Sequence, residues 1–415
     1  MNALRVGFFL AVRQIRRSSP WTTILIIFIM SLTFLNLVAV GGILVGLPVG
    51  ALDSYNEQYS GDVLLRISPT KTYIEQSETI MKTLREFPEV VAISGRYTGK
   101  GVVEANYKTA VGPNQEPDSV NVQLTGIDPA AEELVTDLGG RMLAGEMLKE
   151  GEEGFVVIGK NLLAEYTLGS SLVSATTLKN VVPGSKVRVT VGTNTGEYTV
   201  KGVLGSKVSD VSTRVFLSDV ELRRLLGRTD KNVGEIAIRL RTPEAAVPVR
   251  DSLLALGFGS FARVETARQS QGAFLDDIEE TFVILARVIG GVGLVVASIT
   301  VFIVIFINAV TRRKYIGILK GIGISGTAIE LSYVFQSICY ATIGSAIGLS
   351  VVFFFLAPYF HLHPIDFPFA DGVLLAPIGE TFGRAAMLIG VTIIAGYIPA
   401  RLIVSRNTLD AILGR

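Results

Sequence analysis

The sequence contains few of the residues that bind metals, form disulfides or carry out acid–base chemistry. Its 415 residues include one cysteine, Cys339, and two histidines, His361 and His363. A lone cysteine cannot form an intramolecular disulfide, and two histidines without cysteines or well-spaced acids make a poor metal site. We therefore expect both histidines to lie at a surface or membrane interface, and we expect no metal, cofactor or catalytic residue on this chain.

The chain also has little net charge. The 38 Lys and Arg residues nearly balance the 37 Asp and Glu residues, so no general attraction to nucleic acid and no nucleic-acid partner are expected. Only 18% of the residues are charged whereas 49% are hydrophobic, and the mean hydropathy is +0.48. This balance indicates a membrane protein with a sizeable water-facing part.

Four long stretches contain no charged residue, and we predict that each crosses the membrane as a helix, which needs about 20 residues. The shortest reaches that length if residues 381–382 and its flanking arginines extend it. A secretory signal peptide is the alternative for the first stretch, but residues 47–52 match a cleavage site poorly and the apolar run is too long. The four uncharged stretches are residues 18–52, 288–310, 331–356 and 385–400.

Basic residues are missing from one side of these spans. The loop 358–383 has three acids and no Lys or Arg, whereas the N-terminal arm, residues 311–328 and the C-terminal tail all carry several cations. By the positive-inside rule, both termini and residues 311–328 face the cytoplasm of a multi-pass cell (inner) membrane protein. Residues 49–277 then lie outside, and this segment is long enough to build its own core without disulfides.

The N-terminal arm has apolar residues at helical spacing. Leu4, Phe8 and Ile15 lie on one stripe, and Arg5 and Arg13 lie off it. This pattern fits an amphipathic helix in the membrane interface. An ordinary basic flank that only sets the topology explains the same residues, so both interpretations stay open.

The large outer segment has a β-α-β pattern at each end and several further strands between them. We predict an α+β extracytoplasmic domain in which a β-rich lobe is inserted into a β-α-β lobe. Residues 266–289 read as one helix that continues into the second span as a stalk. The expected β-α-β elements are 61–68, 72–87 and 90–97, then 235–241, 243–256 and 258–264, and the expected inserted strands are 119–127, 154–158, 185–191, 196–204 and 215–217.

These interpretations divide the chain into successive segments. In order, we expect a cytoplasmic amphipathic arm (1–19), span one (20–48), an extracytoplasmic domain (49–277), the stalk end with span two (278–310), a cytoplasmic helix (311–328), span three (329–357), an outer loop (358–380), span four (381–404) and a cytoplasmic tail (405–415).

Two glycine motifs resemble nucleotide-binding loops but lack the required context. Residues 154–160 match G-x-x-x-x-G-K, but Asn161 replaces the hydroxyl residue that follows and Phe155–Ile158 is strand-like. Residues 321–326 match G-x-G-x-x-G but lie between two spans rather than in a βαβ unit. We interpret the second motif as close helix packing and a tight turn.

No span contains a central charged residue, which a self-powered ion-coupled transporter would normally have. The predicted cytoplasmic segments are also too short to fold into an ATPase domain. The remaining class is a non-catalytic membrane subunit that receives energy from, or reports to, a soluble partner. Residues 311–328 are the predicted contact, because they form the longest cytoplasmic feature between two spans.

Several motifs resemble one known family. Residues 289–293 (IGGVG) and 310–323 (VTRRKYIGILKGIG) look like the second span and coupling helix of MacB-type ABC transporter permeases, a superfamily that includes LolC, LolE and FtsX. Residues 396–401 (GYIPAR) and 409–413 (LDAIL) resemble its closing pattern. Acids normally precede the I-G-I core, but Thr311 and Tyr315 occupy those positions here.

The resemblance implies a stand-alone permease subunit with no fused ATPase, a MacB-like outer domain and an FtsX-like permease domain over 278–404. It implies a cytoplasmic ABC ATPase that binds ATP, a second copy or sister permease, membrane lipid, and an adaptor or lipoprotein outside. The all-basic segment suggests an acidic groove on the ATPase. The expected coupling residues are Arg312, Arg313, Lys314, Tyr315, Ile316, Gly317, Ile318, Leu319, Lys320, Gly321 and Gly323, and the expected helix-packing residues are Gly42, Gly46, Gly290, Gly291, Gly293, Gly344 and Gly348.

Two functions remain open at this point. The chain is either a transport permease, driven by mechanotransmission, that exports or extracts a lipoprotein, lipid or peptide, or an FtsX-type transmitter that controls an outer-surface hydrolase or sensor. The size of the outer segment favours transport. The packing glycines serve contacts within one chain or between two chains, and the sequence does not distinguish these cases.

Overall fold

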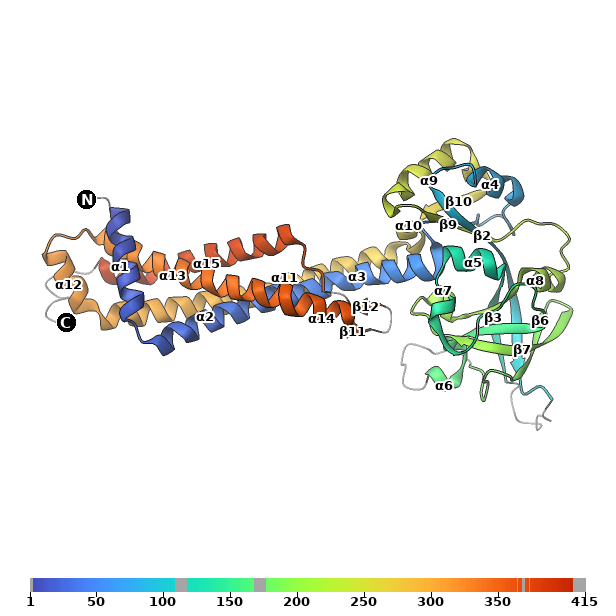
Figure 1. Cartoon of the computed structure of the whole chain (residues 1–415), viewed down its shortest axis with the longest axis horizontal. Coiled ribbons are helices and arrows are strands. Elements are labelled where there is room, and N and C mark those ends of the chain that lie inside the picture. The colour runs from blue at the N-terminus through green and yellow to red at the C-terminus, as the bar shows by residue number, and fades with distance from the viewer. Residues whose placement is uncertain are drawn as a thin grey trace. The chain divides into compact units, whose positions relative to one another are not determined.

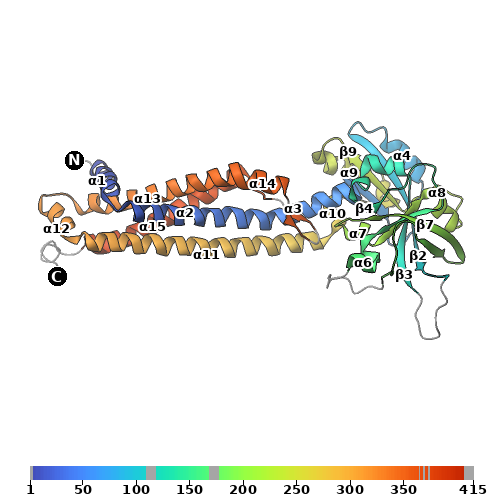
Figure 2. The same ribbon diagram turned by 60° about the horizontal axis from the view of Figure 1, so that its bottom comes forward.

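The computed structural model describes residues 3–108, 118–167, 177–363, 365–367, 370–372 and 374–405. These residues form two compact units, drawn in Figures 1 and 2 as a set of long helices and a β-rich domain. The helical unit comprises the described residues within 1–48, 277–366 and 371–415, and the large domain comprises the described residues within 49–276 and 367–370.

Four helices in the described chain are long and apolar enough to cross a membrane, as predicted. Their central parts contain no charged residue. Because they are helices, their backbone N–H and C=O groups form hydrogen bonds within the segment, as a bilayer requires. The first and third each include single-turn π segments (η). The four helical stretches are Pro20–Ser60 (α2 Pro20–Leu35, η1 Asn36–Val40, α3 Gly41–Tyr55, η2 Asn56–Ser60), Leu275–Thr311 (within α11, Ala273–Thr311), Gly326–Leu362 (α13 Gly326–Val351, η7 Val352–Leu356, α14 Ala357–Leu362) and Ile378–Val404 (α15).

Two shorter helices complete the helical unit. Helix α1 (Ala3–Arg17) precedes the first span, and α12 (Arg313–Gly321) joins α11 to α13. Helix α13 packs against α1, α2 and α15. Its side chains and those of α2 and α11 form a continuous apolar core that includes Met30, Phe34, Ala297, Val301, Tyr333 and Tyr340.

The first lobe of the large domain is a sheet with strand order β10-β1-β9-β2, in which each strand is antiparallel to its neighbour. Each β-α-β unit therefore leaves a gap between its two strands, and a strand of the other unit fills it, as in the ferredoxin-like split βαβ arrangement. The elements are β1 (Val63–Ile67), α4 (Ser77–Leu84), β2 (Val90–Ala105), β9 (Glu235–Leu240), α9 (Ala246–Ala255) and β10 (Ala262–Thr266).

The inserted lobe is a closed six-stranded ring. Strand β2 leaves the first sheet after Arg96, and its second half pairs with β3 and β6. The ring continues from β3 through β8, β5 and β7 to β6, so it has no open edge. The strands are β3 (Ser119–Ile127), β4 (Met142–Gly145), which extends the ring from β7, β5 (Phe155–Gly159), β6 (Lys186–Val191), β7 (Asn194–Leu204) and β8 (Arg214–Ser218).

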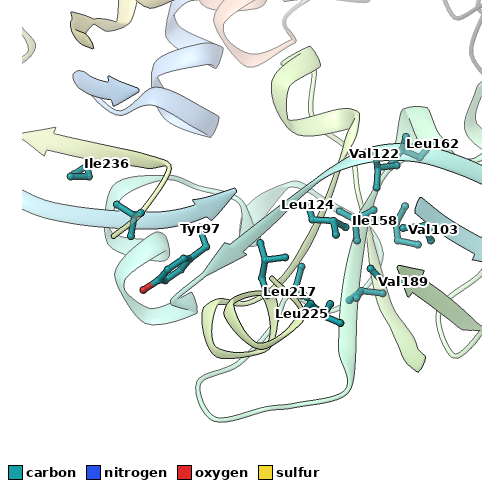
Figure 3. Close-up of a cluster of buried hydrophobic side chains, with 14 of the residues drawn as sticks. Tyr97, Val103, Val122, Leu124, Ile158, Leu162, Val189, Leu217, Leu225 and Ile236 are labelled. Carbon is teal, nitrogen blue, oxygen red and sulfur yellow. The ribbon is translucent and has the colours of Figure 1, made fainter. Parts of the chain in front are cut away.

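One apolar core continues from the first lobe into the ring (Figure 3). Ile236 and Tyr97 lie on the side of the first sheet, and Val103, Leu124, Ile158 and Val189 lie inside the ring. Because β2 contributes side chains to both parts, the two lobes share one core rather than packing as separate domains.

The predicted α+β class is confirmed, and several local predictions need correction. The expected single helix over residues 266–289 is wrong, because α10 (Ala267–Gln271) ends at Gly272, whose φ of +69° is left-handed, before α11 begins. The helix expected over 72–87 is shorter because Gln76, with φ +55°, turns the chain before α4. Elements that were not predicted are α5 (Pro129–Val135), α6 (Ala164–Thr167), α7 (Ser209–Ser212), α8 (Asp219–Leu225), β4, β11 (Ile365–Asp366), β12 (Asp371–Gly372) and the 3-10 turns η3 (Gly139–Arg141), η4 (Lys160–Leu162), η5 (Pro243–Ala245) and η6 (Phe258–Ser260).

Candidate coupling site

Helix α12 is a separate nine-residue helix with defined ends. Arg312, with φ −102° and ψ 13°, departs from helical geometry and separates α12 from α11. At the other end Gly323 has φ +92°, a conformation that favours glycine, and α13 begins after Ser325. Of the two glycines in the G-x-G motif, Gly321 is therefore the last residue of α12, and Gly323 forms the turn that follows it.

One face of α12 is held by the helical unit. Ile316 is 4% exposed and Gly317 is buried, and Leu319 packs against the helical core. The Lys320 ammonium donates a hydrogen bond to the Val404 carbonyl at the end of α15. A cation at this position offsets the negative end of the α15 dipole.

The opposite face of α12 presents apolar side chains to the surroundings. Tyr315 is 70% exposed, Ile318 52% and Ile322 71%. Their spacing of three and four residues places them on one side of a helix. The cation Lys314, four residues before Ile318, lies beside this face, which we call the exposed face of α12. Exposed apolar groups clustered in this way, with polar groups around them, are typical of a protein contact surface.

Helix α1 packs closely against α13. A side chain at Gly7 would lie 2.9 Å from the Leu331 Cβ, so the backbones of α1 and α13 approach closely. Phe8 makes an edge-on contact with Phe335, with ring centroids 5.7 Å apart, and the Gln336 amide donates a hydrogen bond to Gln14. The sequence interpretation missed these contacts. The one signal for them was a glycine on the inner stripe of an otherwise amphipathic helix.

The predicted packing glycines differ in their surroundings. A Cβ at Gly344 would lie 2.5 Å from the Met30 Cβ, and one at Gly348 would lie 2.4 Å from Phe34 Cδ1. The structure therefore places both glycines at the contact between α13 and α2. Of the remaining five, Gly42 lies against the Leu375 carbonyl, Gly290 against Leu37, Gly293 against Asn36, Gly46 lies within α3, and Gly291 has no neighbour within 4 Å among the described residues.

The large domain holds the end of its entry helix through buried charges. Arg96 donates hydrogen bonds to both oxygens of Glu132, at 2.7 and 2.9 Å, and to the Tyr59 carbonyl of η2. Arg214 donates to both oxygens of Glu235 at 3.1 Å and to the Tyr59 hydroxyl, which itself donates to Glu235. These five residues, here called the η2 clamp, are each at most 6% exposed.

The clamp keeps its carboxyl groups ionised. Burial alone raises the pKa of Glu132, but the Arg96 guanidinium and the hydrogen bonds from Arg96, Ser94 and Thr136 outweigh it, so this pKa lies below its usual value. Burial likewise raises the pKa of Glu235, and Arg214, Arg96 and the Tyr59 hydroxyl lower it further than burial raises it. η2 is thus attached to strands β2, β8 and β9 and to helix α5 by buried charged groups that neutralise one another.

Arg239 on β9 completes the attachment. Its guanidinium donates hydrogen bonds to the Asn56 carbonyl and side chain and to the Val135 carbonyl. Asp62, which follows η2, accepts a hydrogen bond from the Leu240 amide at 2.7 Å. The last turn of the helix that starts at Pro20 is therefore a structural part of the large domain.

The helical unit and the chain as a whole are similar to known permeases. The family model described as FtsX-like permease C-terminal matches residues 287–408. The lipoprotein-releasing system transmembrane protein LolC of Neisseria meningitidis serogroup B is 22% identical over 400 residues, which cover 89% of this chain and 92% of that protein.

Two solved outer domains also match parts of the chain. The extracellular domain of the noncanonic ABC-type transporter YknZ from Gram-positive bacteria is 12% identical, covering 50% of this chain and 99% of that domain, with a TM-score of 0.33. The periplasmic region of MacB from Actinobacillus actinomycetemcomitans is 13% identical, covering 51% and 92%, with a TM-score of 0.34. Such scores are too low to define a shared fold. Residues 287–408 are thus similar to the FtsX-like permease C-terminal domain, and 89% of the chain is similar to LolC. With four helices long and apolar enough to cross a membrane, the chain is a multi-pass membrane protein.

Proposed function

We propose that this chain is the membrane subunit through which a separate cytoplasmic ABC ATPase drives an extracytoplasmic domain. The observation that carries this proposal is the exposed face of α12. Tyr315, Ile318 and Ile322 are each more than half exposed there among the described residues. A soluble ATPase that covers this face would gain the burial of three large apolar side chains. The basic flank of the helix, with no acid between Glu280 and Glu330, favours an acidic groove on that ATPase.

In the proposed orientation, both termini and α12 face the cytoplasm and the large domain lies outside, as the distribution of Lys and Arg indicates. Motion of α12 reaches the core of the helical unit through Ile316 and reaches α15 through Lys320. On the other side, the η2 clamp makes the end of the first-span helix move with the large domain. These attachments support mechanotransmission rather than passage of substrate through a pore.

We propose a lipophilic substrate, such as a lipoprotein, lipid or peptide, that is exported or extracted from the membrane. The similarity to a lipoprotein-releasing protein supports this substrate class. The open surroundings of Gly291 and the exposed side chains of Val288, Val292 and Val295 on α11 fit a contact with a second permease, either another copy or a sister subunit. An adaptor or lipoprotein would act at the large domain.

The test uses charge placed on the exposed face of α12. Leu319 packs inward, so the informative variant is Tyr315→Asp with Ile318→Asp, which leaves the buried face of the helix intact. We expect the full-length variant, extracted in mild detergent, to lose its co-purifying ATPase. Leu134→Asp is the matched control, because Leu134 is 69% exposed on α5 of the large domain. Recovery of the ATPase at the wild-type ratio with the double variant would contradict the proposed coupling role.

A further inference from the structure

A cavity of about 350 Å³ lies between α1 and α12, the two short helices at one end of the helical unit (Figures 1 and 2). Its apolar walls include Leu10 of α1 and Ile316 and Leu319 of α12. A second cavity of about 680 Å³ shares Leu10 and Leu319 with it and continues between the same two helices. Together they form a groove with apolar walls, and Tyr315 and Ile318 of the exposed face of α12 also line the smaller cavity.

Three arginines converge on the smaller cavity. Arg13 and Arg17 come from successive turns of α1, and Arg312 comes from the junction of α11 and α12. None of the three forms an ion pair with an acid in the part of the chain that the structure describes. The chain has no acid before Asp53 and none between Glu280 and Glu330, so neither helix offers a counter-charge of its own. The cavity is built to attract an anion.

A buried hydroxyl in the cavity wall also lacks a partner. Tyr333 lines the cavity from α13 and is 1% exposed, and its hydroxyl has no hydrogen-bond partner among the described residues. Buried polar atoms are nearly always hydrogen-bonded, because an unpaired one loses its interaction with water without replacement. An anionic oxygen in the cavity would accept this hydrogen bond together with those of the arginines.

The position of these groups selects the kind of anion. Arg17 lies three residues before Pro20, where the first span begins, and Arg312 follows Thr311, where the second span ends. Both cations therefore lie at the level where phospholipid headgroups meet the spans. The apolar side chains of Leu4, Phe8 and Phe9 on α1 are more than half exposed, as expected for a helix embedded in that layer. We propose that the phosphate of an anionic phospholipid binds between α1 and α12, held by Arg13, Arg17, Arg312 and the hydroxyl of Tyr333.

The bound lipid would fill the space between α12 and α1 and so link the coupling helix to the membrane interface. The inference rests on the membrane placement of the spans and not on the ATPase. A carboxylate from a protein partner is the competing occupant, and it would need to enter the groove from the side of the exposed face of α12.

The test measures binding of fluorescent phosphatidylglycerol to the purified full-length chain in mild detergent, with phosphatidylcholine and inorganic phosphate as comparison ligands. Tyr333→Phe removes only a hydroxyl that has no hydrogen-bond partner among the described residues, so we expect the fold to be preserved. We expect this variant to bind phosphatidylglycerol several-fold more weakly, and Arg17→Gln with Arg312→Gln to bind it at least about tenfold more weakly.

A second pair of substitutions controls for general charge. Arg16→Gln with Lys314→Gln removes the same number of cations from the same two segments, but neither residue lines the cavity. We expect this pair to change binding less than twofold. Equal losses in the two pairs, or unchanged binding in both Tyr333→Phe and the Arg17 and Arg312 pair, would overturn the proposal. Binding of inorganic phosphate as tight as that of the lipid would overturn the lipid assignment. Because Tyr333→Phe leaves the exposed face of α12 unaltered, loss of lipid with retention of the ATPase separates this site from the coupling site.

Discussion

Replacing Glu132 by glutamine removes one charge from the η2 clamp while keeping nearly the same shape. The carboxylate of Glu132 accepts hydrogen bonds from Arg96 at 2.7 and 2.9 Å, from the Ser94 hydroxyl at 2.6 Å and from the Thr136 hydroxyl at 2.7 Å. A glutamine side chain offers one acceptor oxygen, and its amide nitrogen would face a guanidinium N–H. Arg96 would remain buried with part of its charge uncompensated.

The expected loss of stability follows from that geometry. Breaking a buried ion pair by removing one partner costs about 3–5 kcal/mol, because the other charge is left without compensation in the interior. Glu235 lies 3.5 Å from Arg96 and offsets part of this loss, which places the expected value at the lower end, about 3 kcal/mol. At 1.4 kcal/mol for each factor of ten, this corresponds to roughly a hundredfold change in the unfolding equilibrium of the large domain.

Hydrogen exchange followed by mass spectrometry measures this change in the full-length protein in detergent. We expect the slowest amides of β2 and β9 to exchange roughly a hundredfold faster in Glu132→Gln. The matched control is Glu133→Gln, one residue away on α5 and exposed, for which the expected change is within about 0.5 kcal/mol. Equal exchange rates in the two variants would refute the reasoning that the buried charges hold the clamp together.

Further predictions concern acid and helix packing. The pKa values of Glu132 and Glu235 lie below the unfolded value of about 4.3, so the stability that these carboxylates give the large domain is complete above that pH and is lost as the pH falls further. Circular dichroism should therefore show the large domain losing stability below about pH 4.3. A stability that does not change with pH in this range would contradict the prediction. Gly344→Ala should lower the thermal midpoint by forcing α13 and α2 apart, at a cost of about 1–3 kcal/mol, since its Cβ would meet that of Met30. The control is Gly390→Ala, at a site with no neighbour within 4 Å among the described residues, and it should leave the thermal midpoint unchanged. Both midpoints are measured by fluorescence during thermal unfolding. Equal midpoints for the two variants would show that the close contact between Gly344 and Met30 is absent.

The parts that the sequence predicted well are those with local causes. Uncharged runs define the four spans, and the Arg312–Lys314 cluster together with Gly323 marks the segment that becomes α12. The closed ring of strands was not predictable, because the pairings of β2 with β6 and of β3 with β8 join residues far apart in the sequence. The alternation of apolar residues predicts a single strand from its own sequence. Which strands pair with one another depends on how their side chains pack in the common core.

The functional details missed from the sequence are those set by three-dimensional packing. Arg96 lies within β2 and Glu235 begins β9, and charged residues such as these would ordinarily be placed at the surface, yet they pair inside the domain. The sequence predicted both Ile318 and Leu319 as coupling residues, whereas the structure turns Leu319 inward and leaves Ile318 half exposed. The hydroxyl of Tyr333 becomes informative only when its surroundings show that it lacks a partner.

The most direct test of the central claim is to follow the large domain while the ATPase works. In the assembled complex, hydrogen exchange at η2 and β9 should change when ATP is added to the wild-type protein. The change should vanish in Tyr315→Asp with Ile318→Asp and persist in Leu134→Asp. An ATP-dependent change at η2 and β9 that survives the double substitution on α12 would contradict the account, because the motion would then reach the large domain by another route.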